Sequence, residues 1–198
     1  MGQRSQIILL KKQEEDKKEK NIVLSVWHNQ WHYGGSFLSM LSSVLDTWEK
    51  GIKKLKKENS FYDWQIEQLI ENTIRYCDLK DFPYYRKYSK ILEYGAFKEV
   101  KTIEEVFESC DNNNGYIILL LDGDKLSYDI ITGYEDAKEN ISVSAKEYLE
   151  LFYKTELEVK NAGFTPKEMN EILKTIDKSG QFDSQEIILN KEILMVEK

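Results

Sequence analysis

The segment GYIILLLDGDKLSYDI, residues 115–130, constrains the fold of this chain more than any other stretch. An uninterrupted apolar run ends in Asp122-Gly123-Asp124, and a strand-like pattern of alternating residues follows it. An aspartate and a glycine between two β-prone runs are a strong hairpin signal. Because every position of the first run is apolar, we predict a strand that is buried on both faces, inside a sheet.

Two more β-prone runs lie near the N-terminus, SQIILL at residues 5–10 and NIVLSVW at residues 21–27. The residues between them, 11–20, are almost all charged and cannot be buried together. We therefore predict two antiparallel strands joined by a long solvated loop at 11–20. With the 115–131 hairpin they predict an α+β fold, an antiparallel sheet with helices packed on one face.

Residues 34–57 are predicted to form a long amphipathic helix, because their apolar side chains recur at steps of three and four. Ser36, after a glycine pair, is the expected N-cap. Lysines gather near the C-terminal end, where they suit the helix dipole and solvation. A basic patch for a phosphate backbone is the alternative use of these residues, Lys50, Lys53, Lys54, Lys56 and Lys57.

A second amphipathic helix is predicted within residues 60–78, with Trp64, Ile70, Ile74 and Cys77 on its inner side. Three Ser/Thr-x-x-Glu patterns mark further helix starts, and Pro166 occupies the first helical position of the last one. The helices expected from these patterns cover residues 103–109, 145–154 and 166–176.

We predict a main α+β domain at residues 1–155 and a C-terminal helical or extended segment at 156–198 that packs on it. The apolar runs of the tail, residues 184–198, are too short to distinguish a strand from a helix.

The net charge of −7 argues against broad binding to nucleic acid, which requires many lysines and arginines to displace counterions. It is compatible with a basic partner surface. The two cysteines are far apart in sequence and no signal segment or membrane-spanning run is present, so we expect a cytoplasmic protein, in the cytosol of the host cell. Phosphate-binding loops and metal motifs are also missing, and we predict neither a cofactor nor a metal site.

His28 and His32 are the only histidines, and a spacing of four places them on one side of either a helix or a strand. Histidine moves protons near neutral pH, so the pair is a candidate acid and base for cleaving RNA. The plainer alternative is that polar and aromatic residues close a sheet beside a glycine turn.

Polar residues Arg4, Ser5 and Gln6 enter what should be a buried strand, and such residues need hydrogen-bond partners. We expect them to meet the neighbouring strand end, where Gln30, Trp31 and Tyr33 follow His28. Arg4 would fix a carboxylate or phosphate of a ligand, or else belong to an internal network that anchors the N-terminus. The candidate binding residues are therefore Arg4, Ser5, Gln6, Gln30, Trp31 and Tyr33.

The MGQRSQI stretch and the Gln30-Trp31-x-Tyr33-Gly34 element resemble a family of proteins carried by phages, plasmids and other mobile elements of Firmicutes. The resemblance spans roughly residues 1–153, and the charged segment 11–20 departs from it. Such mobile-element sets include anti-CRISPR proteins against the type II effector nuclease, some of which deplete or trim its guide RNA. The resemblance therefore implies an anti-defence role, with the effector or its guide RNA as partner, and it assigns no catalytic residue.

Three hypotheses follow from the sequence. The first is an anti-CRISPR inhibitor encoded by a mobile element, whose acidic surface occupies the basic channel of the effector. The second is a metal-independent RNA nuclease that uses His28 and His32, with Arg4 stabilising the charge on the phosphate. The third is a sponge that sequesters a nucleotide immune signal near Arg4 and Trp31.

Overall fold

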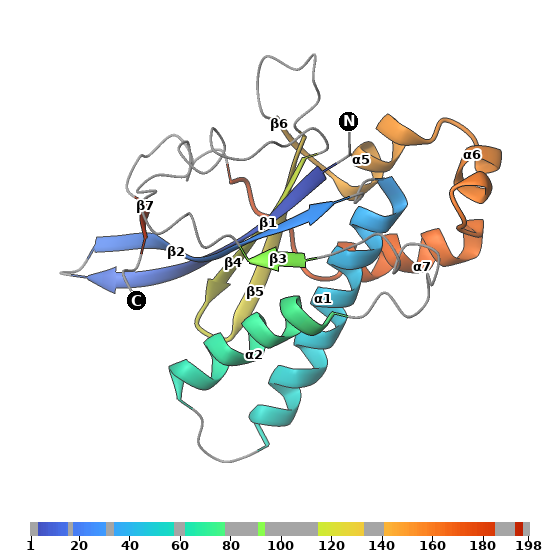
Figure 1. The fold of residues 1–198 in the computed structure, drawn as a ribbon. Helices are drawn as coiled ribbons and strands as arrows, with labels where there is room; N and C mark the ends of the chain where they lie inside the picture. Colours follow the sequence, from blue (N-terminus) through green and yellow to red (C-terminus); the bar gives the residue numbers. More distant parts are fainter. Residues whose placement is uncertain are drawn as a thin grey trace.

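The computed structural model describes residues 4–15, 18–30, 34–57, 62–77, 91–93, 115–132, 141–184 and 193–195 (Figure 1). Its elements in chain order are β1 (Arg4–Glu15), β2 (Lys18–Gln30), α1 (Gly34–Leu55), α2 (Asp63–Tyr76), β3 (Ile91–Glu93), β4 (Tyr116–Asp122), β5 (Lys125–Thr132), β6 (Ile141–Val143), α5 (Ala145–Phe152), α6 (Glu156–Asn161), α7 (Pro166–Asp177) and β7 (Ile193–Met195).

The strands form one mixed, mostly antiparallel sheet in the order β3-β2-β1-β4-β5-β6, and β7 also pairs with β2. The predicted β4–β5 hairpin is confirmed, and Gly123 at its turn has a φ of 58°. The departure from the prediction is that β1 and β4 run parallel, with Ile7 beside Ile117. A parallel pair needs a long crossover, and the chain between β1 and β4 includes the helices α1 and α2.

The described helices pack on one face of the sheet, as the α+β prediction requires. Alternate side chains of the central strands, such as Leu9, Ile117 and Leu119, share one apolar core with α1, α2, α5, α6 and α7. Figure 1 shows α1 in front of the sheet with α2 beside it. The core also takes Val159, Phe164, Met169, Ile172 and Ile176 from the C-terminal segment, so those helices share the core of the strands.

The opposite face of the sheet is buried as well. Ile8, Leu10, Ile118 and Ile131 are each 0% exposed although they point away from the helical layer. The strand β4 is therefore buried on both faces along most of its length, which confirms the prediction made from its uninterrupted apolar run.

The prediction of a long loop at residues 11–20 is wrong. Strand pairing continues from Lys11 beside Ile22 to Glu15 beside Lys18, which leaves only residues 16 and 17 between the strands. Pairing of backbone groups does not require burial of the side chains, so a charged ribbon can project beyond the core. Lys11 is held by Glu67 of α2, with 2.6 Å between nitrogen and oxygen.

Both long helices differ from the prediction in detail. The helix α1 begins at Gly34, so Ser36 lies buried in its first turn and is not the N-cap. In α2 the inner residues are Ile66, Ile70 and Ile74, whereas Trp64 is 59% exposed. At about 100° per residue, Trp64 lies roughly 200° around the helix from Ile66, which is the solvent side.

The capping patterns predict two further helices correctly, α5 after Ser144 and α7 after Thr165. In each case the N-cap side chain accepts from the N3 amide, and the N3 glutamate accepts from the N-cap amide. A third capping box, Thr155 with Glu158, begins α6, although the sequence analysis overlooked it. The helix predicted at 103–109 lies outside the described residues, and β7 shows that part of the tail is strand.

Candidate functional site

The polar end of β1 meets the end of β2, as expected from the sequence. Arg4 pairs with Gln30, Ser5 with Asn29 and Gln6 with His28 in the antiparallel register. Because strand residues alternate between faces, Arg4, Gln6, His28 and Gln30 occupy positions on one face of the sheet. Candidate residues that were selected from two separate segments of the sequence thus lie together at one end of the β1–β2 pair.

The structure describes the side chains of some candidate residues and only the backbone of others. Ser5 and Gln6 are fully buried, and the Gln6 amide donates to the carbonyl oxygen of Gly115 at 3.3 Å. For Arg4, His28 and Gln30 it gives the backbone position. The remaining candidates, Trp31, His32 and Tyr33, lie outside the described residues. The structure therefore places His28 beside Gln6 and Leu92 of the neighbouring strands, and His32 stays a sequence prediction.

Close packing requires glycine at positions 34 and 35, which follow the candidate residues in the sequence. Gly34 has a φ of 53° and begins α1, and the Gly35 amide donates to the hydroxyl of Tyr153 at 3.2 Å. A Cβ on Gly35 would lie 2.4 Å from the Phe164 ring. The N-terminal turn of α1 is therefore pressed against α5 and the loop before α7, which fixes the chain next to the candidate residues.

A second candidate is a surface that sequence reasoning missed, formed at the start of α2. Tyr62 and Trp64 are 65% and 59% exposed, unusually high values for large aromatic side chains. Asp63 lies between them, and Glu67 follows one helical turn later. We call Tyr62, Asp63, Trp64 and Glu67 the acidic aromatic surface. The sequence analysis had assigned Trp64 to the core, although the spacing of the α2 isoleucines places it on the opposite side of the helix.

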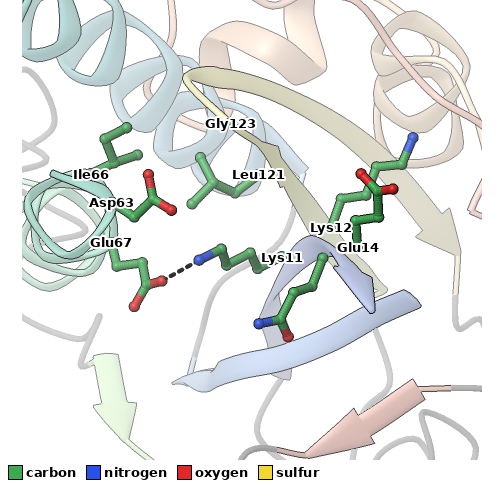
Figure 2. Close-up of a pocket in the computed structure, with 9 residues that line it drawn as sticks. Lys11, Lys12, Glu14, Asp63, Ile66, Glu67, Leu121 and Gly123 are labelled. Atoms are coloured by element: carbon green, nitrogen blue, oxygen red, sulfur yellow. Dashed lines mark hydrogen bonds and ion pairs between the residues drawn. The ribbon is translucent and has the colours of Figure 1, made fainter. Parts of the chain in front are cut away.

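The acidic aromatic surface borders a cavity of about 280 Å³ between α2, the charged part of β1 and the β4–β5 turn (Figure 2). Its lining includes Asp63, Glu67 and Glu14, with Leu121 and Gly123 from the turn region. Figure 2 shows Lys11 reaching Glu67 across this cavity, while Lys12 and Glu14 lie on its other side. The hollow beside the exposed aromatics thus holds three carboxylates and two lysines, and one of these lysines, Lys11, pairs with Glu67.

The five lysines in the last part of α1 and just after it do not form an open basic patch. Lys50 pairs with Asp46 and Lys53 with Glu49, each at 2.5 Å, one helical turn apart. Lys56 pairs with Asp124 of the β4–β5 turn. Since three of the five lysines have a carboxylate partner, the arrangement favours the solvated-helix interpretation over phosphate binding.

The fully buried carboxylate of Asp129 is a further group that the sequence analysis did not select. Its Oδ1 accepts from the Ser142 hydroxyl at 2.6 Å, the Gln181 amide group at 3.0 Å and the Ile130 amide. Its Oδ2 accepts from the amide and the hydroxyl of Ser184. Hydrogen-bond donors occupy both carboxylate oxygens, so neither oxygen is available to a substrate. Asp129 instead holds together β5, β6 and the segment after α7.

The neighbouring side chain of Tyr128, on the helical face, has a strongly perturbed acidity. Burial of the ring, reinforced by the charges of Asp177 and Asp129, raises the pKa of Tyr128 to about 12. The phenol is therefore neutral at physiological pH and does not act as a base.

Among the residues that the structure describes, no group of three histidine, cysteine or acidic side chains is placed to hold a metal ion. Within the same ranges, no helix is both long and apolar enough to cross a membrane. Comparison with protein-family models, curated proteins and solved structures found no match to this chain.

Proposed function

We propose that this protein is an anti-defence inhibitor of a mobile element that acts in the host cytoplasm by binding a type II CRISPR effector, with the acidic aromatic surface as its contact. The observation that carries the proposal is the exposed pair Tyr62 and Trp64 beside Asp63 and Glu67. Tryptophan and tyrosine dominate the energetics of protein interfaces, and carboxylates beside them complement a basic partner. The net charge of −7 acts in the same direction.

The nucleic-acid channel of such an effector is a basic surface of the required kind. An acidic protein seated there would exclude DNA without any chemical step. The pairing of the α1 lysines supports this choice over direct capture of the guide RNA, because few cations remain in that helix to neutralise phosphates.

The test incubates the purified protein with a type II effector, its guide RNA and target DNA, and resolves complexes, guide length and DNA cleavage in parallel. The expected result is a stable complex, intact guide and lost cleavage. Trp64→Ala should weaken inhibition by at least about thirtyfold, the loss of a typical interface hot spot. Leu157→Ala is the matched control, because Leu157 is 65% exposed on α6, away from this surface. Absence of a complex, or equal inhibition by both variants, would reject the proposal.

The second candidate, a metal-independent RNA nuclease, is favoured by the register that places Arg4, Gln6 and His28 on one face of one strand end. It predicts shortened guide RNA in the same assay. His28→Gln combined with His32→Gln should abolish that cleavage while the circular dichroism spectrum stays unchanged. Cleavage that survives in the double variant would eliminate this mechanism.

A further inference from the structure

A cavity of about 500 Å³ lies on the other side of the β4–β5 turn from the one in Figure 2. Its lining comes from the C-terminal half of α1, the hairpin β4–β5 and the turn after α7. Hydrogen bonds from the Tyr128 amide to the Gly180 carbonyl and from the Phe182 amide to the Tyr128 carbonyl hold that turn against β5. The cavity is within the size range of sites that bind small organic molecules.

The floor of this cavity is apolar. One helical stripe of α1 supplies Leu45, Trp48 and Ile52, and the hairpin supplies Leu120 and Leu126. Trp48 is only 5% exposed, so the core fixes its side chain where it lines the cavity. An apolar or aromatic ligand body would bury its surface here with little ordering of side chains.

The rim itself holds three carboxylates and two lysines, so its effective charge depends on the partners of those carboxylates. Each of its carboxylates already has a lysine partner: Glu49 pairs with Lys53, Asp122 with Lys12 and Asp124 with Lys56. Two rim lysines remain, Lys125 and Lys178, and neither makes an ion pair with any residue in the described ranges. The hydroxyl-bearing residues Ser127 and Ser179 lie beside them in the lining.

We propose that this cavity binds a small amphipathic anion, with its apolar or aromatic body on the floor around Trp48 and its anionic group near Lys125 and Lys178. An aliphatic carboxylate and a nucleoside monophosphate share this chemistry. The site is separate from the acidic aromatic surface, so a negative test of the proposed function would leave this proposal unaffected, and the reverse also holds.

The probe is anilinonaphthalene sulfonate, which joins an aromatic body to one anionic group and fluoresces in apolar sites. It is expected to bind the native protein, with energy transfer from tryptophan that falls in Trp48→Phe. Lys125→Glu combined with Lys178→Glu should weaken binding about tenfold, since each exposed charge contact contributes a factor of a few. The matched control is Lys167→Glu with Lys174→Glu, which makes the same charge change at two exposed positions of α7 outside the cavity.

Displacement of the probe by decanoate would identify an aliphatic ligand, and displacement by adenosine monophosphate a nucleotide; either result supports the site. Equal weakening in the two double variants would show that only net charge matters and would overturn the proposal. So would the absence of probe binding, unchanged energy transfer in Trp48→Phe, or displacement by decanol as effective as by decanoate. Displacement by none of the three competitors would overturn it as well.

Discussion

Asp129 accepts a hydrogen bond from the backbone amide of Ser184 at 3.0 Å, although 55 positions separate the two residues in the sequence. The same carboxylate receives the hydroxyls of Ser142 and Ser184 and the side chain of Gln181. A single buried charge thus holds together an edge strand and the segment that follows α7.

Asp129→Asn should therefore be strongly destabilising. The substitution preserves size but replaces one acceptor oxygen by a donor that faces other donors. We expect a loss of about 2 to 4 kcal/mol in the free energy of unfolding, measured by urea denaturation. Ser142→Ala, which removes one donor and leaves the charge, should cost about 1 kcal/mol. If the two variants lost the same stability, the anchoring role would be wrong.

Alkaline pH should destabilise the folded protein through Tyr128. The pKa of its phenol is raised in the folded state to about 12 from an ordinary 10.0, because burial disfavours the phenolate. The unfolded chain therefore loses this proton first, so the stabilisation is complete below pH 10 and is lost as the pH rises toward 12. Urea midpoints across this range should fall less steeply in Tyr128→Phe than in the native protein. Parallel curves would contradict this assignment.

The capping box of α7 should contribute measurably to stability. Thr165→Ala removes the side chain that accepts from the Glu168 amide at 3.2 Å, and a lost N-cap costs about 1 kcal/mol. Thr175→Ala is the matched control, because the hydroxyl of this half-buried threonine bonds only to a carbonyl within the same helix. Thermal denaturation should show a lower midpoint for the first variant alone, and equal midpoints would refute the contribution.

The same box should weaken in acid. Hydrogen bonds from the side chain and the backbone of Thr165 lower the pKa of the Glu168 carboxyl from its ordinary value of 4.5. A carboxyl with a lowered folded-state pKa stabilises the native state above its unfolded pKa and ceases to do so as the pH falls through the folded value. Nuclear magnetic resonance titration of Glu168 should therefore give a lower midpoint in the native protein than in Thr165→Ala. An unchanged midpoint would argue against these bonds.

Gly35→Ala should destabilise the protein by steric crowding at the start of α1. Its new methyl group would meet the Phe164 ring at 2.4 Å, and overpacking of this kind costs about 1 to 3 kcal/mol. Phe164→Leu alone should also destabilise, but the double variant should lose less than the sum of the two, because the smaller side chain makes room. Strict additivity in urea denaturation would show that the two residues do not clash.

Most of the fold could be predicted from local sequence signals. The apolar run of β4, the turn at Gly123 and the capping boxes of α5 and α7 depend on neighbouring residues, and the structure confirms them. One error occurs where tertiary contacts decide the structure, because residues 11–15 remain in a strand in which Lys11 contacts Glu67 of α2. The assignment of Trp64 to the core was instead a misread local pattern, since the spacing of the isoleucines places Trp64 on the solvent side of α2.

The candidate site was predictable only in part. Polar residues at the start of β1 and at the end of β2 were enough to predict that these two strand ends meet, and the antiparallel register then pairs Gln6 with His28. The exposure of Tyr62 had no local signal, whereas the four-residue spacing of Ile66, Ile70 and Ile74 does place Trp64 on the opposite side of α2. Asp129 also had a local signal, since an aspartate in a buried strand implies several hydrogen-bond donors from elsewhere in the chain.

The parallel pairing of β1 with β4 also determines the order in which this protein can be completed during synthesis. The apolar run Ile7–Leu10 leaves the ribosome early, but its partner at Ile117–Leu120 is translated much later. Until then one edge of the β1–β2 ribbon has no strand beside it, and an apolar edge of this kind pairs readily with other chains. Nascent chains stalled before residue 116 are therefore expected to need a chaperone, whereas chains released after the β4–β5 hairpin can close the centre of their own sheet.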